Sequence, residues 1–348
     1  MNYQNYDTVL EYLPNSNIAI NDFIYNESNN VFTSLKELCD ASKTNTFVVS
    51  LSGGVDSMVL LSVLHYLRKK VIAIHINYNN RTESTQEELF LKEWCGFNDI
   101  ILYTKQITHI TRDSSKRSDY EGITKDIRFT LYREIMRLHH VDCILLAHHK
   151  DDTIENIFTN ICRGRSILNL AVLKESSVIQ DVCIKRPLLN VYKSEIYDFA
   201  HEHDVPYFKD TTPLWSIRGM YRNILFPKLQ NVFGNKIKQN LLNFNQETIE
   251  WSTLISDQII EPFLNACMYD NIMVQFEYKK EYTTYPLCFW NTVLMKISYK
   301  YQHPCPSRKS ILNFMCFIKN KTEGTINLSA KCKCSLVNKI IELTFSEP

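Results

Sequence analysis

Apolar and polar positions change their spacing repeatedly along the chain after about residue 30. Short runs rich in β-branched and aromatic residues predict strands, and longer stretches with apolar residues three and four apart predict helices. The predicted strands are Thr46–Leu51, Val71–Ile76, Ile100–Ile107, Asp142–Ala147 and Val182–Lys185. The predicted helices are Ser57–Arg68, Ser84–Cys95, Glu121–His140, Asp151–Cys162 and Lys193–His203. This alternation predicts an α/β fold with a doubly wound, mostly parallel sheet.

The pattern changes twice towards the carboxyl terminus. A turn-rich crossing near residue 213 leads into a long helical stretch, and from about residue 270 short strand-like and helical segments follow. We therefore predict four parts: an N-terminal extension, an α/β domain, a helical linker and a small α+β domain. Their predicted bounds are 1–44, 45–213, 214–268 and 269–348.

Composition narrows the class of protein. The 348 residues carry a net charge of only +1, so the chain as a whole is not a polyanion binder. The eleven cysteines include no C-x-x-C pair, which argues against a zinc ribbon or a dithiol redox site. Their odd number favours a reducing compartment, and we expect a cytoplasmic protein. No apolar run is long enough to cross a bilayer, so no membrane partner is expected.

Charge is concentrated near the end of the chain. Residues 291–348 contain nine Lys or Arg and three Glu, a balance of +6, whereas the remainder is close to −5. Tyr299, Tyr301 and His303 are interleaved among these charges. Basic residues with interleaved aromatics are typical of RNA-binding surfaces, so the C-terminal domain is predicted to bind RNA. The alternative is a solvated basic face on a small packing domain.

Two adjacent glycines interrupt the first predicted strand–helix junction, in the string SGGVDS at residues 52–57. Glycine lets backbone N–H groups approach an anion closely, and the following helix adds its positive N-terminal end. Ser52 and Ser57 add hydroxyl donors, but Asp56 would repel a phosphate unless a cation lies between them. The string therefore predicts a nucleotide bound with Mg²⁺. A plain tight turn is the alternative, and a Walker A loop is excluded because no G-x-x-x-x-G-K-[ST] occurs.

Two further polar strings follow predicted strands: NYNNR at residues 77–81 and HHKDD at residues 148–152. Ligands of doubly wound sheets bind beyond the carboxyl ends of the strands, where these strings lie. Asp151 and Asp152 predict a Mg²⁺ site or a general base, with helix capping as the alternative. His148 and His149 either contact a ligand or are satisfied core residues.

Several of these strings resemble the motifs of a known family. SGGVDS resembles the PP-loop of the N-type ATP pyrophosphatases, which adenylate a carbonyl oxygen before a nucleophile displaces AMP. LAHHKDDTIENIFTNICRG, residues 146–164, resembles the A-H-H-x-x-D-D-x-x-E-T stretch of the tRNA(Ile)-lysidine synthetases, which ends in Arg-Gly. The matching residues are His148, His149, Asp151, Asp152, Glu155, Arg163 and Gly164.

Three more motifs of this family occur in the same order, so the resemblance covers residues 45–232. HINYNNRTES, YEGITKDIRF and DTTPLWSIRGMYRN are similar to its segments after the second strand, at a helix start and at the crossing. The matching residues are His75, Arg81, Glu83, Ser84, Glu121, Arg128, Asp210, Arg222 and Asn223, with Lys125 standing for Arg. Departures are Tyr78 for His, Pro213 for Asn, and RSILNL in place of a Ser-Gly-rich loop after Gly164. Smaller departures are Asn79 for Gly, Phe129 for Tyr and Asn156 for Thr.

The resemblance implies a fold like the adenine nucleotide alpha hydrolases and a ligase that attaches free lysine to C2 of a tRNA wobble cytidine. It implies ATP and Mg²⁺ as cofactors, with Mg²⁺ held by Asp56 and Asp152. Implied ATP-binding residues are Ser52, Gly53, Gly54, Val55, Asp56, Ser57, His75 and His148. Implied catalytic residues are Asp151, Asp152, Arg128 and Arg163, and implied substrate-binding residues are Glu121, Lys125, Arg222 and Asn223.

Two other functions stay open at this point. The chain could transfer sulfur or a different amine to RNA by the same ATP chemistry, or bind tRNA or a protein without turnover. An intact SGGxDS and an intact Asp-Asp pair argue against the non-catalytic alternative. The absence of a C-x-x-C argues against the cluster-dependent thiolases. The sequence leaves a homodimer open and does not identify the tRNA.

Overall fold

The computed structural model describes residues 1, 3–14, 20, 28–79, 83–108, 117–320 and 323–346. Arg81, which matches the family motif, lies outside the described residues. The chain divides into two compact units. Unit 1 comprises Met1–Arg163 and Ala171–Asn245, and unit 2 comprises Gly164–Leu170 and Gln246–Pro348. The four-part division made from the sequence stays a prediction.

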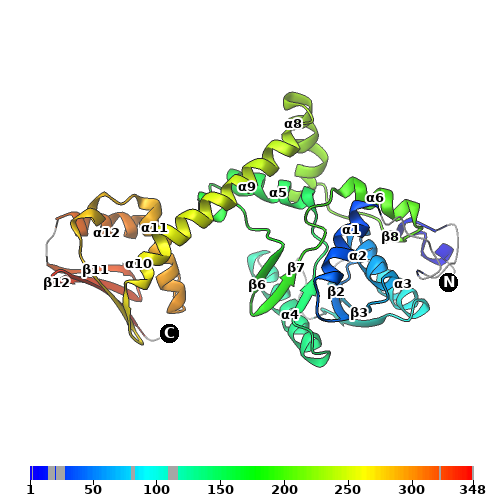
Figure 1. The fold of residues 1–348 in the computed structure, drawn as a ribbon, viewed down its shortest axis with the longest axis horizontal. Helices are drawn as coiled ribbons and strands as arrows, with labels where there is room; N and C mark the ends of the chain where they lie inside the picture. The colour runs from blue at the N-terminus through cyan, green and yellow to red at the C-terminus, as the bar shows by residue number, and fades with distance from the viewer. Residues whose placement is uncertain are drawn as a thin grey trace. The chain divides into compact units, whose positions relative to one another are not determined.

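Unit 1 alternates strands and helices (Figure 1). Its strands are β1 (Leu10–Tyr12), β2 (Thr46–Ser50), β3 (Lys70–Asn77), β4 (Ile101–Gln106), β5 (Cys143–Leu145), β6 (Ser176–Ile179), β7 (Val182–Lys185) and β8 (Tyr207–Phe208). Its helices are α1 (Asn30–Asp40), α2 (Val55–Tyr66), α3 (Ser84–Phe97), α4 (Arg117–Leu138), α5 (Lys150–Cys162), α6 (Lys193–Glu202), α7 (Ile217–Met220) and α8 (Phe226–Phe233), with a 3₁₀ turn η1 (Tyr3–Tyr6) and a π-helical turn η4 (Tyr221–Leu225). Helix α9 (Ile237–Ile255) begins in unit 1 and ends in unit 2.

The main sheet of unit 1 has the strand order β4-β3-β2-β5-β7-β6. All neighbouring pairs are parallel except β6 and β7, which confirms the doubly wound, mostly parallel sheet. Strand β2 lies inside the sheet. The chain runs from it to β3 and β4 on one side and then crosses to β5 on the other side. The carboxyl ends of β2 and β5 therefore form the switch point where ligands bind in such sheets.

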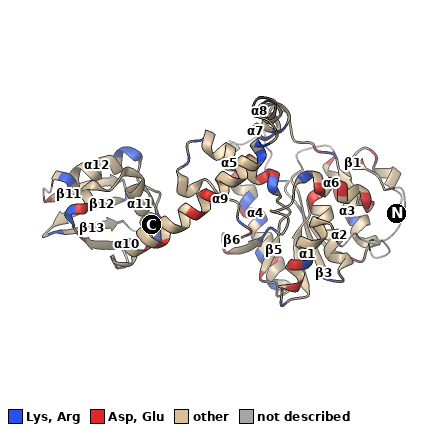
Figure 2. Ribbon diagram, turned by 45° about the horizontal axis from the view of Figure 1, so that its top comes forward, with Lys and Arg blue, Asp and Glu red and all other residues tan. Residues whose placement is uncertain are grey.

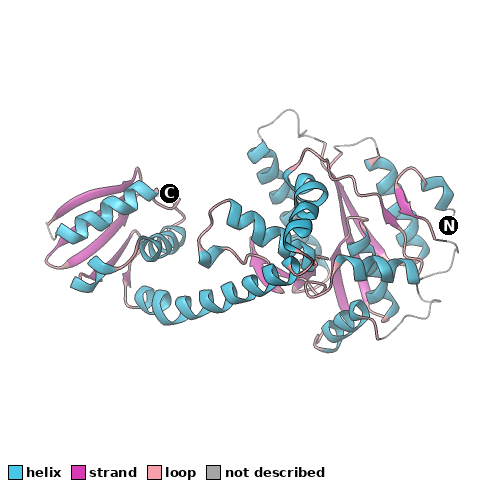
Figure 3. Ribbon diagram, turned by 90° about the horizontal axis from the view of Figure 1, so that it is seen from above, coloured by secondary structure: helices cyan, strands magenta, loops and turns pink. Residues whose placement is uncertain are grey.

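Helices cover both faces of this sheet. Val49 of β2 belongs to a core that contains residues of α1, α2, α3 and α6. Val48 points to the opposite face and joins a core with Phe129 and Tyr132 of α4. Burial on both faces explains why the strands read as continuous apolar runs without polar alternation. The helical layers are visible on the two sides of the magenta strands in Figure 3.

The N-terminal segment is part of unit 1 and pairs with β8, the strand that contacts the glycine-rich turn. Strand β1 pairs with β8 in a separate two-stranded sheet, with Leu10 opposite Phe208. Leu10 is buried in the same core as α2. The Phe208 backbone N–H in turn donates to the Gly53 carbonyl at 2.9 Å. Residues before the main sheet therefore support the turn between β2 and α2.

Unit 2 is a small α+β fold. Its elements are 3₁₀ turn η3 (Ile167–Asn169), π-helical turn η5 (Ser256–Ile260), α10 (Glu261–Asn265), β9 (Met268–Tyr269), β10 (Met273–Glu277), 3₁₀ turn η6 (Lys280–Thr284), α11 (Leu287–Lys300), α12 (Arg308–Asn320), β11 (Gly324–Ser329), β12 (Cys332–Val337) and β13 (Ile340–Phe345). The five strands form an antiparallel sheet in the order β11-β12-β13-β10-β9. Trp290 and Phe314 pack its core from α11 and α12. Arg308, Lys309, Lys331 and Lys333 are exposed on α12 and the β11–β12 hairpin, where Figure 2 shows blue segments.

All five predicted strands and all five predicted helices occur, with bounds that differ by a few residues. The pattern missed α1, β6 and the short pair β1 and β8. Helix α4 begins at Arg117, four residues before the predicted start. Within the part of the chain that the structure describes, no helix has the length and apolar character needed to cross a membrane.

Candidate active site

Strand β2 and helix α2 hold the glycine-rich turn in place. Gly54 is the N-cap of α2 and makes no side-chain capping hydrogen bond, so the helix N-terminus stays available to an anion. Ser57 is buried, and its hydroxyl donates to the Gly54 carbonyl at 3.0 Å and accepts from the Ser52 N–H at 3.2 Å. Ser57 thus shapes the turn from inside, whereas Ser52, Gly54, Val55 and Asp56 line a cavity.

The backbone conformation and the close packing at Gly53 both exclude a residue with a side chain. Its φ is +83°, in the left-handed region that side chains rarely adopt. A Cβ built on Gly53 would lie 2.0 Å from the Phe208 ring. Phe208 belongs to β8, so the β1–β8 sheet packs directly on the turn. The first glycine of the string is therefore required for both conformation and packing.

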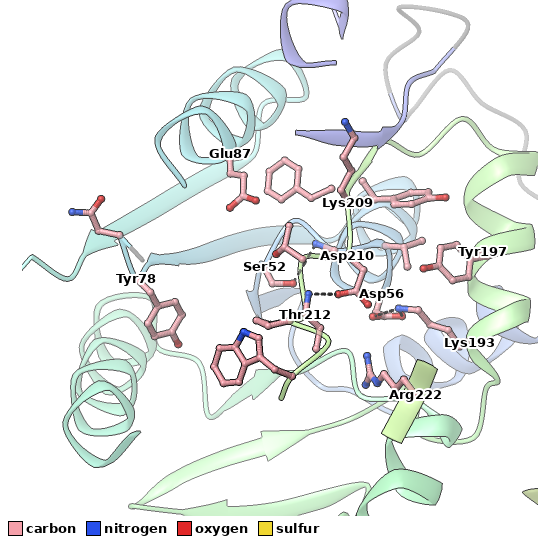
Figure 4. Close-up of a pocket in the computed structure, with 18 residues that line it drawn as sticks. Ser52, Asp56, Tyr78, Glu87, Lys193, Tyr197, Lys209, Asp210, Thr212 and Arg222 are labelled. Atoms are coloured by element: carbon pink, nitrogen blue, oxygen red, sulfur yellow. Dashed lines mark hydrogen bonds and ion pairs between the residues drawn. The ribbon is translucent and has the colours of Figure 1, made fainter. Parts of the chain in front are cut away.

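The cavity has a volume of about 690 Å³ and lies in unit 1 at the carboxyl ends of the strands (Figure 4). This size suits a nucleotide-sized ligand. Besides the turn, Lys193 and Arg222 line it, and in Figure 4 both lie on the right with Asp56 while Tyr78 lies on the left. Trp215 also lines the cavity.

Asp56 is paired with a lysine from a distant part of the chain. Lys193 is the first residue of α6, and its Nζ lies 2.7 and 2.6 Å from the Oδ1 and Oδ2 atoms of Asp56. The same ammonium lies 5.1 Å from the centre of the Tyr197 ring. Lys193 therefore neutralises the carboxylate inside an anion-binding turn, so that Asp56 does not repel a phosphate there.

Two arginines bind the acids at the start of α5. Arg222 and Arg218 lie 3.0 and 3.4 Å from Oδ1 of Asp152, and each donates from Nε to a Glu155 carboxylate oxygen at 2.7 Å. The other Asp152 oxygen accepts the His149 backbone N–H at 3.2 Å. Arg222 lies in the π-helical turn η4, an irregularity that is frequent at functional sites.

Asp151 faces the other side of the same helix start. Its Oδ2 accepts the backbone N–H of Lys193 at 2.9 Å, and its Oδ1 accepts from the Lys238 ammonium. Burial raises the pKa of the Asp151 carboxyl, but the bonds from Lys238 and Lys193 outweigh it and leave the pKa below its usual value. Asp151 thus links α5 to α6, the helix that carries Lys193.

The Asp152 pKa is lowered as well. Burial raises it, while the neighbouring His149, His148 and Arg218 lower it by more. A carboxylate with a depressed pKa is a weaker proton acceptor than free aspartate. At neutral pH both acids of the pair are charged, which suits them to bind cations and to stabilise positive charge.

Two histidines, His75 and His148, lie close to the site without lining the cavity. His75 is buried, with Nδ1 2.9 Å from the Leu51 carbonyl just before the turn. Arg186 donates from Nε to His148 Nδ1 at 3.2 Å, and burial lowers the His148 pKa to about 4, so this ring is neutral at pH 7. Neither ring lines the cavity, and the ATP-binding role predicted for both stays a prediction.

His149 lies among three carboxylates. Its Nε2 is 3.7 Å from Asp56 and 3.4 Å from Asp152, and its Nδ1 is 3.8 Å from Asp151. The almost fully buried imidazole lies between the three carboxylates and keeps their negative charges apart, which would otherwise repel one another. The SGGVDS and HHKDD strings therefore meet at one point, as their positions after adjacent strands predict.

The donor set can be tested for Mg²⁺. Asp56 and Asp152 lie within 4 Å of the same imidazole nitrogen, and Mg²⁺ is usually held by one or two carboxylates plus substrate phosphates. Among the described residues no group of three or more His, Cys, Asp or Glu side chains is arranged to hold a metal by itself. The pair therefore fits an ion that arrives with a nucleotide, and it does not fit a permanent protein-bound metal.

Four predicted site residues lie elsewhere. Glu121 and Lys125 are exposed on α4, where the Lys125 ammonium lies 5.7 Å from the Phe129 ring centre. Arg128 contacts the same ring, and Arg163 is the exposed C-cap of α5. None of the four lines the cavity. Asn223, Asp151 and Asp152 do not line the cavity either, although they lie next to residues that do. The Asn223 amide donates to the Gly219 carbonyl at 2.9 Å, beside Arg222.

Sequence reasoning missed Lys193, Lys238 and Arg218 as site residues. One signal was available for Lys193, because a cation in the first turn of a helix opposes the helix dipole and indicates a specific acidic partner. Arg218 and Arg222 are four residues apart, and four-residue spacing places side chains on one helix face. Lys238 lies on α9 and nothing in its surrounding sequence points to Asp151.

Comparisons with known proteins agree with this geometry. Residues 27–231 match the model of the PP-loop domain family. The chain is similar to tRNA(Ile)-lysidine synthase from Chlamydia caviae, 29% identical over 65% of this chain and 71% of that protein. It is 30% identical to the synthases of Chlamydia trachomatis, over 64% of this chain and 69% of the relative, and of Enterococcus faecalis, over 64% and 48%. The solved U34-tRNA thiolase NcsA from Methanococcus maripaludis shares the fold, with a TM-score of 0.51 and 18% identity over 63% of this chain and 78% of the thiolase.

Proposed function

Because this chain belongs to the tRNA(Ile)-lysidine synthase family of PP-loop proteins, we propose that it uses ATP to attach lysine to the wobble cytidine of a tRNA. The observation that carries the proposal is the single cavity shared by the SGGVDS turn, Lys193 and Arg222. An anion-binding turn and two cations in one cavity suit the triphosphate of ATP. A cytoplasmic location is part of the same proposal.

The first step is adenylation of the base. The C2 carbonyl oxygen of cytidine attacks the α-phosphorus of ATP, and pyrophosphate leaves. Ser52 and the backbone N–H groups at the start of α2 bind the phosphates, and Lys193 and Arg222 stabilise the charge that develops on them. Mg²⁺, held by Asp56 and Asp152 when ATP is bound, would neutralise further phosphate charge.

The second step attaches the amine. The free amino group of lysine attacks C2 and AMP leaves with the former C2 oxygen. An ammonium has a pKa of about 10.4 and must lose a proton before it attacks. Asp151 and Asp152 are the candidate acids for binding the ammonium, in exchange for the contacts that they now make with Lys238 and Arg222. The proton passes to water, and the neutral amine then attacks C2.

A different amine is the second candidate. The segment Gly164–Leu170, which stands where the family has a Ser-Gly-rich loop, belongs to unit 2 in this structure. Tyr78 and Pro213 also depart from the family motifs.

Several residues outside the cavity stay candidates for contacts with tRNA. They are Glu121, Lys125, Arg128 and Arg163, together with the exposed basic residues of the predicted C-terminal domain 269–348. A homodimer remains part of the hypothesis.

The test is transfer of radiolabelled lysine to tRNA, with pyrophosphate release measured in the same reaction. We expect lysine transfer and repeated pyrophosphate release to require ATP, tRNA and lysine together, and ATP and tRNA without lysine to give at most one pyrophosphate per enzyme. Asp56→Asn should abolish both signals. Asp40→Asn is a matched control, because Asp40 is exposed at the end of α1. Pyrophosphate release with another amine and not with lysine would favour the second candidate, and no release with any tRNA would refute the proposal.

A further inference from the structure

Five aromatic side chains line the same cavity as the SGGVDS turn. Tyr197, Tyr207 and Phe208 belong to α6 and β8, whereas Tyr78 and Trp215 lie on loops. Tyr78 follows β3, and Trp215 precedes α7, so distant segments bring them to one site. Trp215 is 66% exposed, and Tyr78 is partly exposed. A large aromatic ring that is open to solvent at the edge of a ligand cavity commonly marks a binding surface.

Tyr78 and Trp215 both stand on a fixed backbone. Asn79 follows Tyr78 with φ +47°, and its N–H donates to the Asn77 side chain at 2.8 Å. The Asn77 side chain is buried and donates to Glu88 of α3 at 2.8 Å. Tyr78 is thus held between two anchored positions, which lowers the entropy lost when a ligand binds to it.

Trp215 is anchored in a similar way. The next residue, Ser216, donates from both its N–H and its hydroxyl to the Pro213 carbonyl, at 2.9 and 2.7 Å. Its hydroxyl also accepts the Gly219 N–H at 3.0 Å. A Cβ on Gly219 would lie 2.1 Å from the Pro213 oxygen, so the backbone packs tightly around the turn. The indole is presented by a rigid turn at the mouth of the cavity.

The ligand that rigid aromatic rings bind best is another planar ring. Single-stranded RNA bases stack on such side chains, and each stacked base contributes about 1–3 kcal/mol. The adenine of ATP could stack in the same way. A small ligand such as ATP usually has about 70–90% of its surface buried in its pocket. The Trp215 side chain, in contrast, lies mostly in solvent. Its exposure therefore favours a base that enters from outside over the nucleotide that lies inside.

We propose that Trp215 and Tyr78 receive the unstacked tRNA base and hold it against the ATP bound at the SGGVDS turn. This inference rests on the proposed function, because it assigns the base to be modified to one wall of that site. It also gives a reason for Tyr78 to stand where the family has His, since both rings can stack on a base.

The test uses an anticodon stem–loop RNA with the fluorescent base pyrrolocytidine at the wobble position and a non-hydrolysable ATP analogue. Stacking quenches this base, so we expect wild-type protein to quench it and Trp215→Ala to weaken quenching and RNA affinity about 5- to 150-fold. Trp215→Phe and Tyr78→Phe should keep most of the effect, and Tyr78→Ala should not. Trp251→Ala is the matched control, because Trp251 is also about half exposed but does not line the cavity.

Steady-state kinetics distinguish stacking on the tRNA base from stacking on the adenine of ATP. They also test this inference separately from the proposed function. For Trp215→Ala we expect kcat/KM for tRNA to fall while KM for ATP stays within about twofold. A raised KM for ATP with unchanged RNA quenching would assign the ring to adenine and overturn the inference. Full activity of Trp215→Ala and Tyr78→Ala would overturn it while the proposed function stands. Quenching that depends on Trp215, without product from any tRNA, would support the base site and refute the proposed chemistry.

Discussion

The Lys193 ammonium contacts both carboxylate oxygens of Asp56, at 2.6 and 2.7 Å. The pair joins the first turn of α6 to the first turn of α2, 137 residues apart in the chain. An acid in a phosphate-binding turn is favourable only if a cation compensates it. Lys193 supplies that cation from the protein, next to the position where the phosphates of ATP would lie.

Lys193→Met should therefore weaken ATP binding. Loss of a charged hydrogen-bond donor costs about 1.5–3 kcal/mol, so we expect KM for ATP to rise by roughly 10- to 150-fold. Lys43→Met is the matched control, because Lys43 is exposed before β2. Initial rates of pyrophosphate release at varied ATP give both values. An unchanged KM for ATP in Lys193→Met would mean that this lysine has no role at the phosphates.

Gly53→Ala should disrupt the turn between β2 and α2. The left-handed backbone and the contact with the Phe208 ring together should cost on the order of 3 kcal/mol of unfolding free energy, with loss of ATP binding. Gly96→Ala is a control of opposite sign, because Gly96 lies in α3 with nothing within 4 Å of its Cβ position. That change should stabilise by about 0.5–1 kcal/mol. Urea unfolding measures both, and equal stabilities would contradict the packing described.

The SGGVDS turn could be predicted from the sequence, whereas the pairing of Asp56 with Lys193 could not, because the position of Lys193 indicates an acidic partner without identifying it. The turn is bounded by an apolar strand and an apolar helix that are adjacent in the chain, so local pattern identifies it. Lys193, Lys238 and Trp215 come from segments whose positions depend on the order of the strands. The pairing of β1 with β8 was also missed, because strands of three and two residues are too short to show periodicity.

That missed pairing predicts a role for the N-terminal segment. Leu10 is 1% exposed and pairs with Phe208, so Leu10→Ala should remove about 2–5 kcal/mol of unfolding free energy and loosen the turn at Gly53. Glu11→Ala is the neighbouring control, since Glu11 is exposed. Chemical unfolding with and without ATP reports the effect. If Leu10→Ala left both stability and ATP affinity unchanged, the segment would not support the site.

Protonation of His148 should weaken the fold as the pH falls. Burial lowers its pKa to about 4, whereas an unfolded histidine has a pKa of about 6.5, so the unfolded chain binds the proton first. The stabilisation is complete above pH 6.5 and is lost between pH 6.5 and 4. Between pH 7 and 5 His148 should account for a loss of roughly 2 kcal/mol.

His148→Gln should show a correspondingly smaller loss of unfolding free energy between these pH values. The control is His140→Asn, because His140 is exposed and asparagine tolerates its φ of +53°. Urea titrations of the three proteins at pH 7 and pH 5 give the six values needed. Parallel losses in His148→Gln and the wild type would show that another group titrates in this range.

The most direct test of the account is mass spectrometry of nucleosides from tRNA(Ile) with an unmodified wobble cytidine, incubated with the protein, ATP, Mg²⁺ and lysine. Lysidine synthesis should give a cytidine whose mass has increased by one lysine less one water, formed only with all components. No such product should form with Asp56→Asn, and Asp40→Asn should give the normal yield. Unmodified cytidine after incubation with folded wild-type protein and every component, or a sulfur-containing base in its place, would contradict the proposed reaction.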